Sequence, residues 1–235
     1  MATWQEQIHK EHPPEPKAIK GRANGSDDLR SALVAIHDHA GKEVGLLAPP
    51  AAGVYDAMVA TAWADEKVVL IPEAPDETFR PLAVQKAIFA KRYTTTNTGV
   101  KGRVCPPGAG GITYFKVDSK VKTAACPGTS NHGRGIAVDF DLEQNGALEW
   151  LEANAKRFGW QWEVEKEPWH LHYMLGDGLP TGITLPEEDD MTDDQAAQLK
   201  GIFDAIVEVR DNQRKVVTDL AAVKARLDTL EGKTP

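Results

Sequence analysis

The chain has 235 residues, of which 41% are hydrophobic and 26% charged, and its formal net charge is -8. This length can bury a full core, with one domain and an appendage as the natural expectation. The acidic balance argues against a general nucleic-acid binder, which would show a basic face. No apolar run approaches the roughly 18 residues of a membrane span, so we expect no membrane insertion.

Residues 1–27 are polar and rich in proline and glycine, and we interpret them as an extended arm. They lack the apolar centre of a secretory signal. We therefore expect synthesis in a cytoplasm, with any export depending on another protein.

The pattern of apolar residues over 28–178 predicts helices first and strands later. Helices are expected at SDDLRSALVAIHDHAG (26–41), PPAAGVYDAMVATAWADEK (49–67), RPLAVQKAIFAKRY (80–93) and GALEWLEANAKRFGW (146–160). Strands are expected at KVVLIP (67–72), GIAVDFDL (135–142), WQWEVE (160–165) and PWHLHYML (168–175), with GITYFKVDSKV (111–121) as a hairpin or an excursion. This order indicates an α+β fold with a small, mostly antiparallel sheet.

A linker with two prolines and an acidic run follows at 179–191, and then a heptad pattern extends over 192–231. Apolar residues recur there at steps of three and four, interrupted once by Gln213, which is typical of a coiled coil. We predict self-association through this helix. The alternative is an amphipathic helix that folds back on the domain.

Two cysteines, Cys105 and Cys126, bracket a 20-residue segment. We expect two reduced thiols, because no export signal is evident. A disulfide that closes the intervening loop is the alternative. Neither cysteine lies in a CxxC pair, so a cysteine-based zinc site is not expected.

The stretch CPGTSNHGRGIAVDF (126–140) carries the strongest chemical signal. On a strand, alternation would place Ala137 and Asp139 on one face, so that a small residue leaves a hollow beside the carboxylate. The glycines before this strand permit turns that could curl His132 over the same hollow. A histidine and a carboxylate converging in this way form two-thirds of a catalytic zinc site.

Candidates for the remaining groups lie in EKEPWHLHYM. His170 and His172 would share one face of a strand, and either could reach the metal. Glu167 could take a proton from water and deliver it to a leaving amine. Arg80, at the start of a predicted helix, could stabilise an oxyanion. The other histidines of the chain are interpreted as surface or core residues.

Two signatures in this region resemble one known family. SNHGRGIAVD fits S-x-H-x-x-G-x-A-x-D, and EPWH fits E-x-x-H, of the D-alanyl-D-alanine carboxypeptidase and L-alanyl-D-glutamate endopeptidase family of VanY-like zinc peptidases. FRPLAVQ is similar to the family segment Y-R-S-x-x-x-Q and keeps Arg80 and Gln85, but Pro81 stands where serine is usual. The resemblance spans about residues 28–178.

The resemblance implies a role for each matching residue. It makes His132, Asp139 and His170 the ligands of Zn²⁺, and it places His172 beside them or against the substrate. Glu167 becomes the general base and acid, and Arg80 stabilises the tetrahedral intermediate, while Ser130 and Gln85 support the site. The implied fold is a small antiparallel sheet flanked by helices, of the hedgehog/DD-peptidase type.

The resemblance also implies hydrolysis of peptidoglycan stem peptides. Because no signal peptide is evident, we expect a bacteriophage endolysin that is made in the host cytoplasm and reaches the cell wall after holin-type release. L-alanyl-D-glutamate endopeptidase activity is favoured. The alternatives are a D-alanyl-D-alanine carboxypeptidase, a virion-associated lysin, a cytoplasmic dipeptidase and a non-catalytic wall-binding protein.

Overall fold

The computed structural model describes residues 3–9, 13–106 and 111–184. The predicted coiled coil at 192–231 and the later part of the linker lie outside these residues, so self-association stays a prediction. In the part of the chain that is described, no helix has both the length and the apolar character needed to cross a bilayer.

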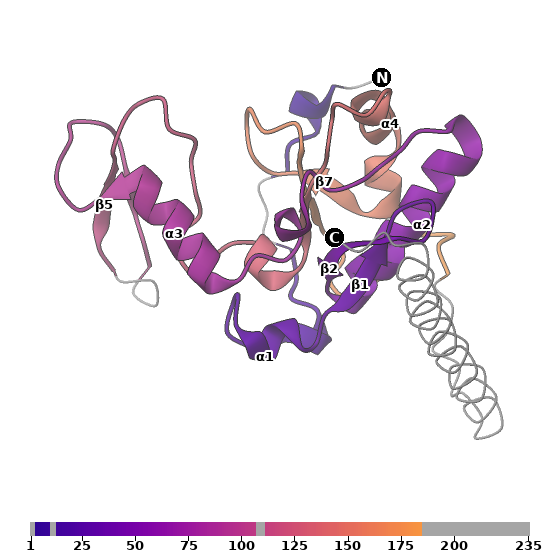
Figure 1. Cartoon of the computed structure of the whole chain (residues 1–235), viewed down its shortest axis with the longest axis horizontal. Coiled ribbons are helices and arrows are strands. Elements are labelled where there is room, and N and C mark those ends of the chain that lie inside the picture. Colours follow the sequence, from indigo (N-terminus) through magenta and orange to yellow (C-terminus); the bar gives the residue numbers. More distant parts are fainter. Residues whose placement is uncertain (1–2, 10–12, 107–110, 185–235) are drawn as a thin grey trace, which may run out of the picture. The chain divides into compact units, whose positions relative to one another are not determined.

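Short helices and strands follow one another along the chain (Figure 1). The α-helices are α1 (Asp27–Arg30), α2 (Pro49–Glu66), α3 (Leu82–Arg92) and α4 (Ala147–Asn154). The 3-10 turns are η1 (Trp4–Gln7), η2 (Lys17–Ile19), η3 (Pro75–Glu77), η5 (His132–Arg134) and η6 (Ala155–Phe158). The strands are β1 (Val34–His37), β2 (Glu43–Leu47), β3 (Tyr93–Thr94), β4 (Arg103–Val104), β5 (Thr113–Lys116), β6 (Ala137–Asp139), β7 (Trp160–Trp162) and β8 (His170–Tyr173).

The strands form three small antiparallel sheets, in the orders β1-β2, β3-β5-β4 and β6-β8-β7. This arrangement confirms the predicted α+β class. In the third sheet, the register of β6 and β8 pairs Asp139 with His170 and Ala137 with His172. The last residue of β6 and the first residue of β8, 31 positions apart in sequence, thereby meet at one end of this strand pair.

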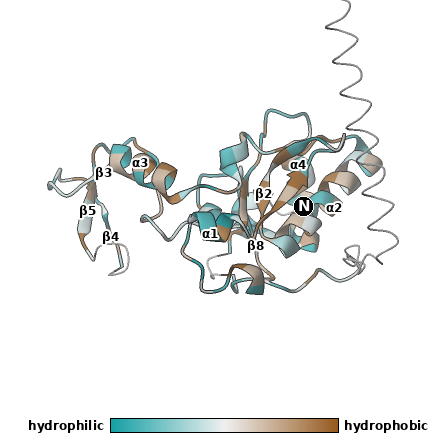
Figure 2. Cartoon of the chain, turned by 60° about the horizontal axis from the view of Figure 1, so that its bottom comes forward, coloured by the Kyte–Doolittle hydropathy of each residue, from teal (hydrophilic) through white to brown (hydrophobic). Residues whose placement is uncertain are grey.

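The main core lies between α2, α4 and the sheet β6-β8-β7, where Figure 2 shows apolar residues on the facing elements. Tyr55 and Met58 on α2, and Trp160, Trp162 and Tyr173 on the sheet, are almost fully buried. Burying side chains of this size stabilises a fold by roughly 1.5–3 kcal/mol each. The sheet that carries Asp139 and His170 is therefore held rigidly.

The prediction of one helix over 26–41 is wrong beyond its first turn. Ser26 caps α1 as expected, since its hydroxyl accepts a hydrogen bond from the Leu29 amide at 3.0 Å. The chain then forms β1, which pairs with β2. Its residues include the β-branched Val34 and Ile36, which favour strands, so this pairing prevails over the helical spacing.

The segment KVVLIP, predicted as a strand, is not one: Lys67 ends α2 in the left-handed conformation with φ of +58°, and the segment forms one isolated bridge, between Pro72 and Phe140. The described parts of residues 3–27 do not extend freely as an arm. Trp4 and Ile19 are buried, and the His9 amide donates to the Trp162 carbonyl at 2.7 Å.

The prediction of two reduced cysteines is wrong. Cys105 and Cys126 form a disulfide with an Sγ–Sγ distance of 1.96 Å. It lies among α3, β3, β4 and β5, which together with the segment up to Cys126 make up what we call the disulfide lobe (residues 82–106 and 111–126). The buried cluster of this lobe contains only Phe89, Tyr93 and the two cysteines. A core this small favours a covalent crosslink.

Candidate metal centre and its cleft

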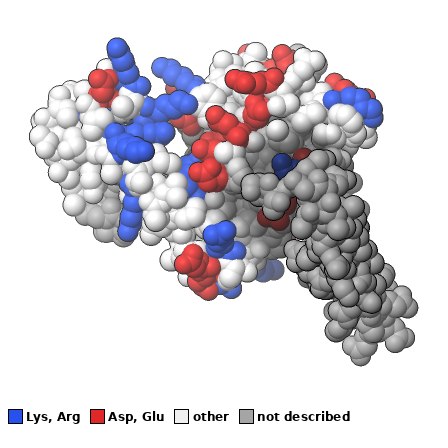
Figure 3. Space-filling view, viewed as in Figure 1, with Lys and Arg blue, Asp and Glu red and all other residues white. Residues whose placement is uncertain are grey.

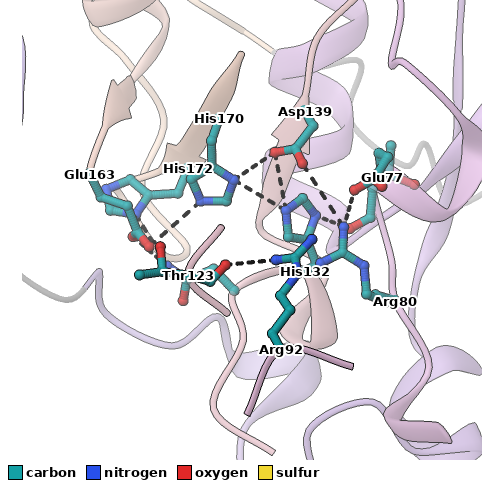
Figure 4. Close-up of polar contacts among 11 residues, drawn as sticks. Glu77, Arg80, Arg92, Thr123, His132, Asp139, Glu163, His170 and His172 are labelled. Atoms are coloured by element: carbon teal, nitrogen blue, oxygen red, sulfur yellow. Dashed lines mark hydrogen bonds and ion pairs between the residues drawn. The ribbon is translucent and has the colours of Figure 1, made fainter. Parts of the chain in front are cut away.

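Three side chains bring ligand atoms to one point (Figure 4). Asp139 Oδ1 lies 2.6 Å from His170 Nδ1 and 3.2 Å from His132 Nε2, and the two nitrogens are 3.2 Å apart. These residues are the one group of potential metal ligands found among the described residues. The structure thus brings together the three ligands that the resemblance implied.

Local structure explains why these side chains converge. His132 begins the turn η5, which ends at Gly135 in the left-handed conformation with φ of +66°. A side chain at Gly135 would be strained and would meet Leu33. The chain then enters β6, whose register with β8 sets Asp139 against His170.

Hydrogen bonds set which nitrogen each imidazole presents. His132 Nδ1 lies 3.1 Å from the Thr78 carbonyl oxygen. Since a carbonyl can only accept, Nδ1 carries the proton and Nε2 offers its lone pair. His170 Nε2 faces Glu163 Oε1 at 3.6 Å, so that its Nδ1 points to the centre.

Two imidazole nitrogens and one carboxylate oxygen suit Zn²⁺, which binds three protein ligands in catalytic sites and keeps a fourth position open. Zinc–ligand bonds of about 2.0–2.1 Å in a tetrahedral site imply ligand atoms roughly 3.3 Å apart. The separations of 2.6–3.2 Å at this centre are close to that value. The donor set therefore fits the predicted cofactor.

The charges at this centre are strongly coupled. Burial by itself would raise the pKa of Asp139, but hydrogen bonds and charge from His132 and His170 hold it well below its usual range. Burial lowers the pKa of His132. Burial also opposes protonation of His170, yet Asp139 and Glu163 on its two sides raise its pKa to about 10. Without metal, His170 is therefore a cation between two carboxylates.

Glu167 and Arg80, the two residues predicted to act on the substrate, line the same cleft as the ligand triad. Burial raises the pKa of Glu167, as does the charge of Asp139, against the opposing effect of His170. Arg80 Nη2 lies 3.9 Å from Asp139 Oδ2 and forms an ion pair with Glu77. Arg80 Nε is buried with no hydrogen-bond partner among the described residues.

Ser130 and Gln85, expected to support the site, are both buried. Gln85 Nε2 donates to the Cys126 carbonyl at 3.1 Å, and Gln85 Oε1 accepts from the Gly128 amide at 3.0 Å. This pair of bonds ties α3 to the loop before His132. Ser130 lines the cleft, and its carbonyl accepts from Asn24 Nδ2 at 2.8 Å.

His172 lies outside the ligand group, behind His170. It is fully buried, and its Nδ1 contacts Glu163 Oε2, which also accepts from Asn131 Nδ2 at 2.6 Å. Burial would raise the pKa of Glu163, but hydrogen bonds from His170 and His172 hold it well below its usual range. Glu163 is therefore an anion that braces both histidines.

Sequence reasoning missed Glu163, Glu77 and Asn131. Glu163 lies in WQWEVE, where nothing in the pattern distinguishes it from Glu165. Its position just after β7, which pairs with β8, could have been a signal only once that pairing was known.

Comparisons with known proteins agree with this site. A family model described as VanY, D-alanyl-D-alanine carboxypeptidase, matches residues 46–177. A D-alanyl-D-alanine carboxypeptidase from Enterococcus faecalis (strain ATCC 700802 / V583) is 31% identical in an alignment of length 106 that covers 37% of this chain and 40% of that protein. The chain thus aligns with less than half of that relative's length.

Two solved structures are also similar to the chain. One is a mutant of the vancomycin resistance D,D-pentapeptidase VanY, from a VanB-type resistance cassette, in complex with Zn(II). Its sequence is 20% identical to this chain, the TM-score is 0.39, and the superposition covers 73% of this chain and 88% of that chain. The other is VanYB in complex with D-alanine-D-alanine, 19% identical with a TM-score of 0.37, covering 74% and 84%.

Asp139 and His170 on two neighbouring antiparallel strands, together with His132 on the turn η5, form a group of two histidines and one aspartate in a cleft. Such a group defines the class of mononuclear metal sites that zinc peptidases use. The family match covers more than half of the chain. The chain therefore belongs to the VanY family of D-alanyl-D-alanine carboxypeptidases, which confirms the resemblance found in the sequence.

Proposed function

We propose that this chain is a zinc-dependent peptidase that hydrolyses peptidoglycan stem peptides. The observation that carries the proposal is the convergence of ligand atoms from His132, Asp139 and His170 within 4.8 Å of one another. They line a cleft of about 420 Å³ that also contains Glu167 and Arg80. Metal-assisted hydrolysis requires these groups in one cleft: a metal-ligand triad, a carboxylate and a guanidinium.

His132, Asp139 and His170 would hold the metal, which when bound polarises a carbonyl and lowers the pKa of bound water to about 7. Glu167 accepts the proton of the attacking water and returns it to the leaving amine. Its raised pKa favours a group that both takes up and releases a proton during the reaction. Arg80 lines the cleft beside Asp139, so its guanidinium can donate to a developing oxyanion.

The name of the matching family and that of the enterococcal relative favour release of the terminal D-alanine from the stem peptide. Cleavage between L-alanine and D-glutamate, and a role as a bacteriophage endolysin released by a holin or carried in the virion, stay predictions from the sequence. Self-association through 192–231 would raise avidity for the wall by multivalency.

Mass spectrometry of a defined muropeptide tests both the reaction and the bond. Free D-alanine would identify a carboxypeptidase, whereas a new N-terminal D-glutamate or D-isoglutamine would identify an endopeptidase. Activity should disappear with a chelator and return with zinc. If the zinc-loaded chain releases no fragment from purified peptidoglycan or from soluble stem peptides, the proposal fails.

A further inference from the structure

One wall of the cleft carries positive charge that the reaction itself does not use. Arg92 ends α3, Arg103 lies on β4, and Lys122 lies in the segment before Cys126; all three line the cleft together with the metal-ligand triad. We call these three residues the basic wall. In Figure 3, Lys and Arg side chains gather on the left of the view, over the disulfide lobe.

Each cation of the basic wall is held by a partner that does not neutralise it. Arg92 Nη1 donates to the Thr123 carbonyl at 2.7 Å, and Arg103 Nη1 donates to the Ala124 carbonyl. The Lys122 ammonium lies 4.2 Å from the centroid of the Trp169 ring. Within residues 3–9, 13–106 and 111–184, none of the three forms an ion pair.

These partners orient the side chains and leave donors for a ligand. A guanidinium has five N–H groups in a planar fork, which can bind a carboxylate through two parallel hydrogen bonds. An ammonium has three donors, and contact with an aromatic face occupies none of them fully. Cations of one sign along a cleft wall also focus the electrostatic field on the space in front of them.

The remaining charges of the cleft decide where an anion would bind. Glu73, Glu77, Glu163 and Glu167 line the same cleft and would repel it, although Glu167 lies near enough to Lys122 and Arg92 for their charges to lower its pKa. Apart from the metal centre and Arg80, the basic wall is therefore the part of this cleft that favours a substrate anion. The disulfide fixes that place, because Arg103 and Lys122 lie two and four residues from the bridged cysteines.

We propose that the basic wall is a subsite that binds a free carboxylate of the peptide substrate. This inference rests on the proposed peptidase function and deepens it, since it makes the charge of the peptide a determinant of specificity. The carboxylate has two possible sources in a stem peptide: its C-terminus, or the acidic residue within it.

Steady-state kinetics of charge-removing variants on matched peptides test the subsite. The variants are Arg103→Gln and Lys122→Met, with Lys101→Met and Lys91→Met as controls, because both control lysines are exposed in the same lobe but do not line the cleft. One pair of substrates is acetyl-lysyl-D-alanyl-D-alanine and its C-terminal amide. The other is a stem pentapeptide containing D-isoglutamate and its D-isoglutamine counterpart.

For the peptide whose carboxylate is bound, each variant should raise KM about tenfold, the loss of one charge-assisted hydrogen bond, while the KM of the controls stays unchanged. The KM of the neutral counterpart should be the same for the wild type and the variants. If the neutral counterpart is not cleaved, its inhibition constant is measured instead. Added salt should weaken binding of the charged peptide alone. The pair that shows this difference identifies the source of the carboxylate.

Three results would overturn part of the reasoning, each in a different way. If wild type cleaves no peptide, the proposed function itself fails. If wild type cleaves the peptides but both variants keep its KM, the basic wall is not a subsite. If KM rises equally for charged and neutral peptides, the residues act on the structure of the lobe, and the subsite is again refuted.

Discussion

The disulfide offers the sharpest test of how the cleft is built. Replacing both cysteines with alanine, Cys105→Ala with Cys126→Ala, removes the crosslink between positions 21 residues apart. For a loop of this length, the chain-entropy account predicts a stabilisation of about 3.4 kcal/mol at 25 °C. The buried cluster of the disulfide lobe is separate from the main core, so we expect the loss to fall on this lobe.

Amide hydrogen exchange measures that loss residue by residue. A change of about 3.4 kcal/mol corresponds to roughly 300-fold faster exchange for amides that exchange through opening of the lobe. Amides of β3 and β5 should show this increase, while those of β6 and β8 should not. The wild-type protein, reduced in denaturant and refolded under reducing conditions, is the control without side-chain truncation, and it should behave like the variant.

Two outcomes would refute this reasoning. Unchanged exchange in β3 and β5 would mean that their packing alone holds the lobe. An equal increase in β6 and β8 would mean that the lobe and the sheet with the metal ligands unfold as one unit.

Five further predictions concern the metal centre and the C-terminal segment. Glu163→Gln should weaken zinc binding roughly 10–100-fold, because loss of a carboxylate that bonds to a ligand histidine has this effect. The control Glu149→Gln, an exposed change on α4, should leave zinc affinity unchanged. Equal zinc affinities of the Glu163→Gln variant and the wild type would contradict the bracing role of Glu163. Glu167→Gln should lower kcat by about 10²–10⁴ with zinc still bound, and metal loss in this variant would point to a misassigned ligand. Because the pKa of Glu167 is raised and the base must be ionised, wild-type activity should fall with decreasing pH through a value above the usual 4.3 or so. Since the pKa of His170 is about 10 without metal, zinc binding at pH 7 should release about one proton from His170, and zinc affinity should increase as pH rises. Calorimetry in buffers of different ionisation heat measures the number of protons released. No proton release would mean that His170 is neutral before zinc binds. Deleting residues 190–235 should give a monomer that still cleaves soluble peptide, and unchanged oligomeric mass in sedimentation would refute the coiled coil.

Two of the three ligands, His132 and Asp139, were predictable because their signal is local. The spacing from His132 to Asp139 combines a glycine turn with strand alternation, and both features are set by neighbouring residues. The choice between His170 and His172 was not settled by alternation, since both share a face of β8. It depends on the pairing with β6, where Asp139 lies opposite His170, and the resemblance supplied that choice.

The errors of sequence reasoning share a physical cause. The helix predicted over 26–41 fails where β1 meets β2, and the reduced cysteines fail because β4 and the loop before His132 approach each other in space. Glu163 acquires its role only by lying against His170 and His172. In each case the deciding contact is tertiary, and local propensity contains no information about it.

The segment around Asn24 and Gly25 changes where the functional unit must be taken to begin. Asn24 holds the Ser130 carbonyl, the Gly25 amide donates to the Gly133 carbonyl at 2.7 Å, and the Gly25 carbonyl accepts from the Leu82 amide at 2.9 Å. These hydrogen bonds connect two parts of the chain: the turn that carries His132, and the start of α3. The family match begins only at residue 46. A chain shortened to begin at residue 46 would keep all three metal ligands. It would lose the hydrogen bonds from Asn24 and Gly25 that position the turn carrying His132.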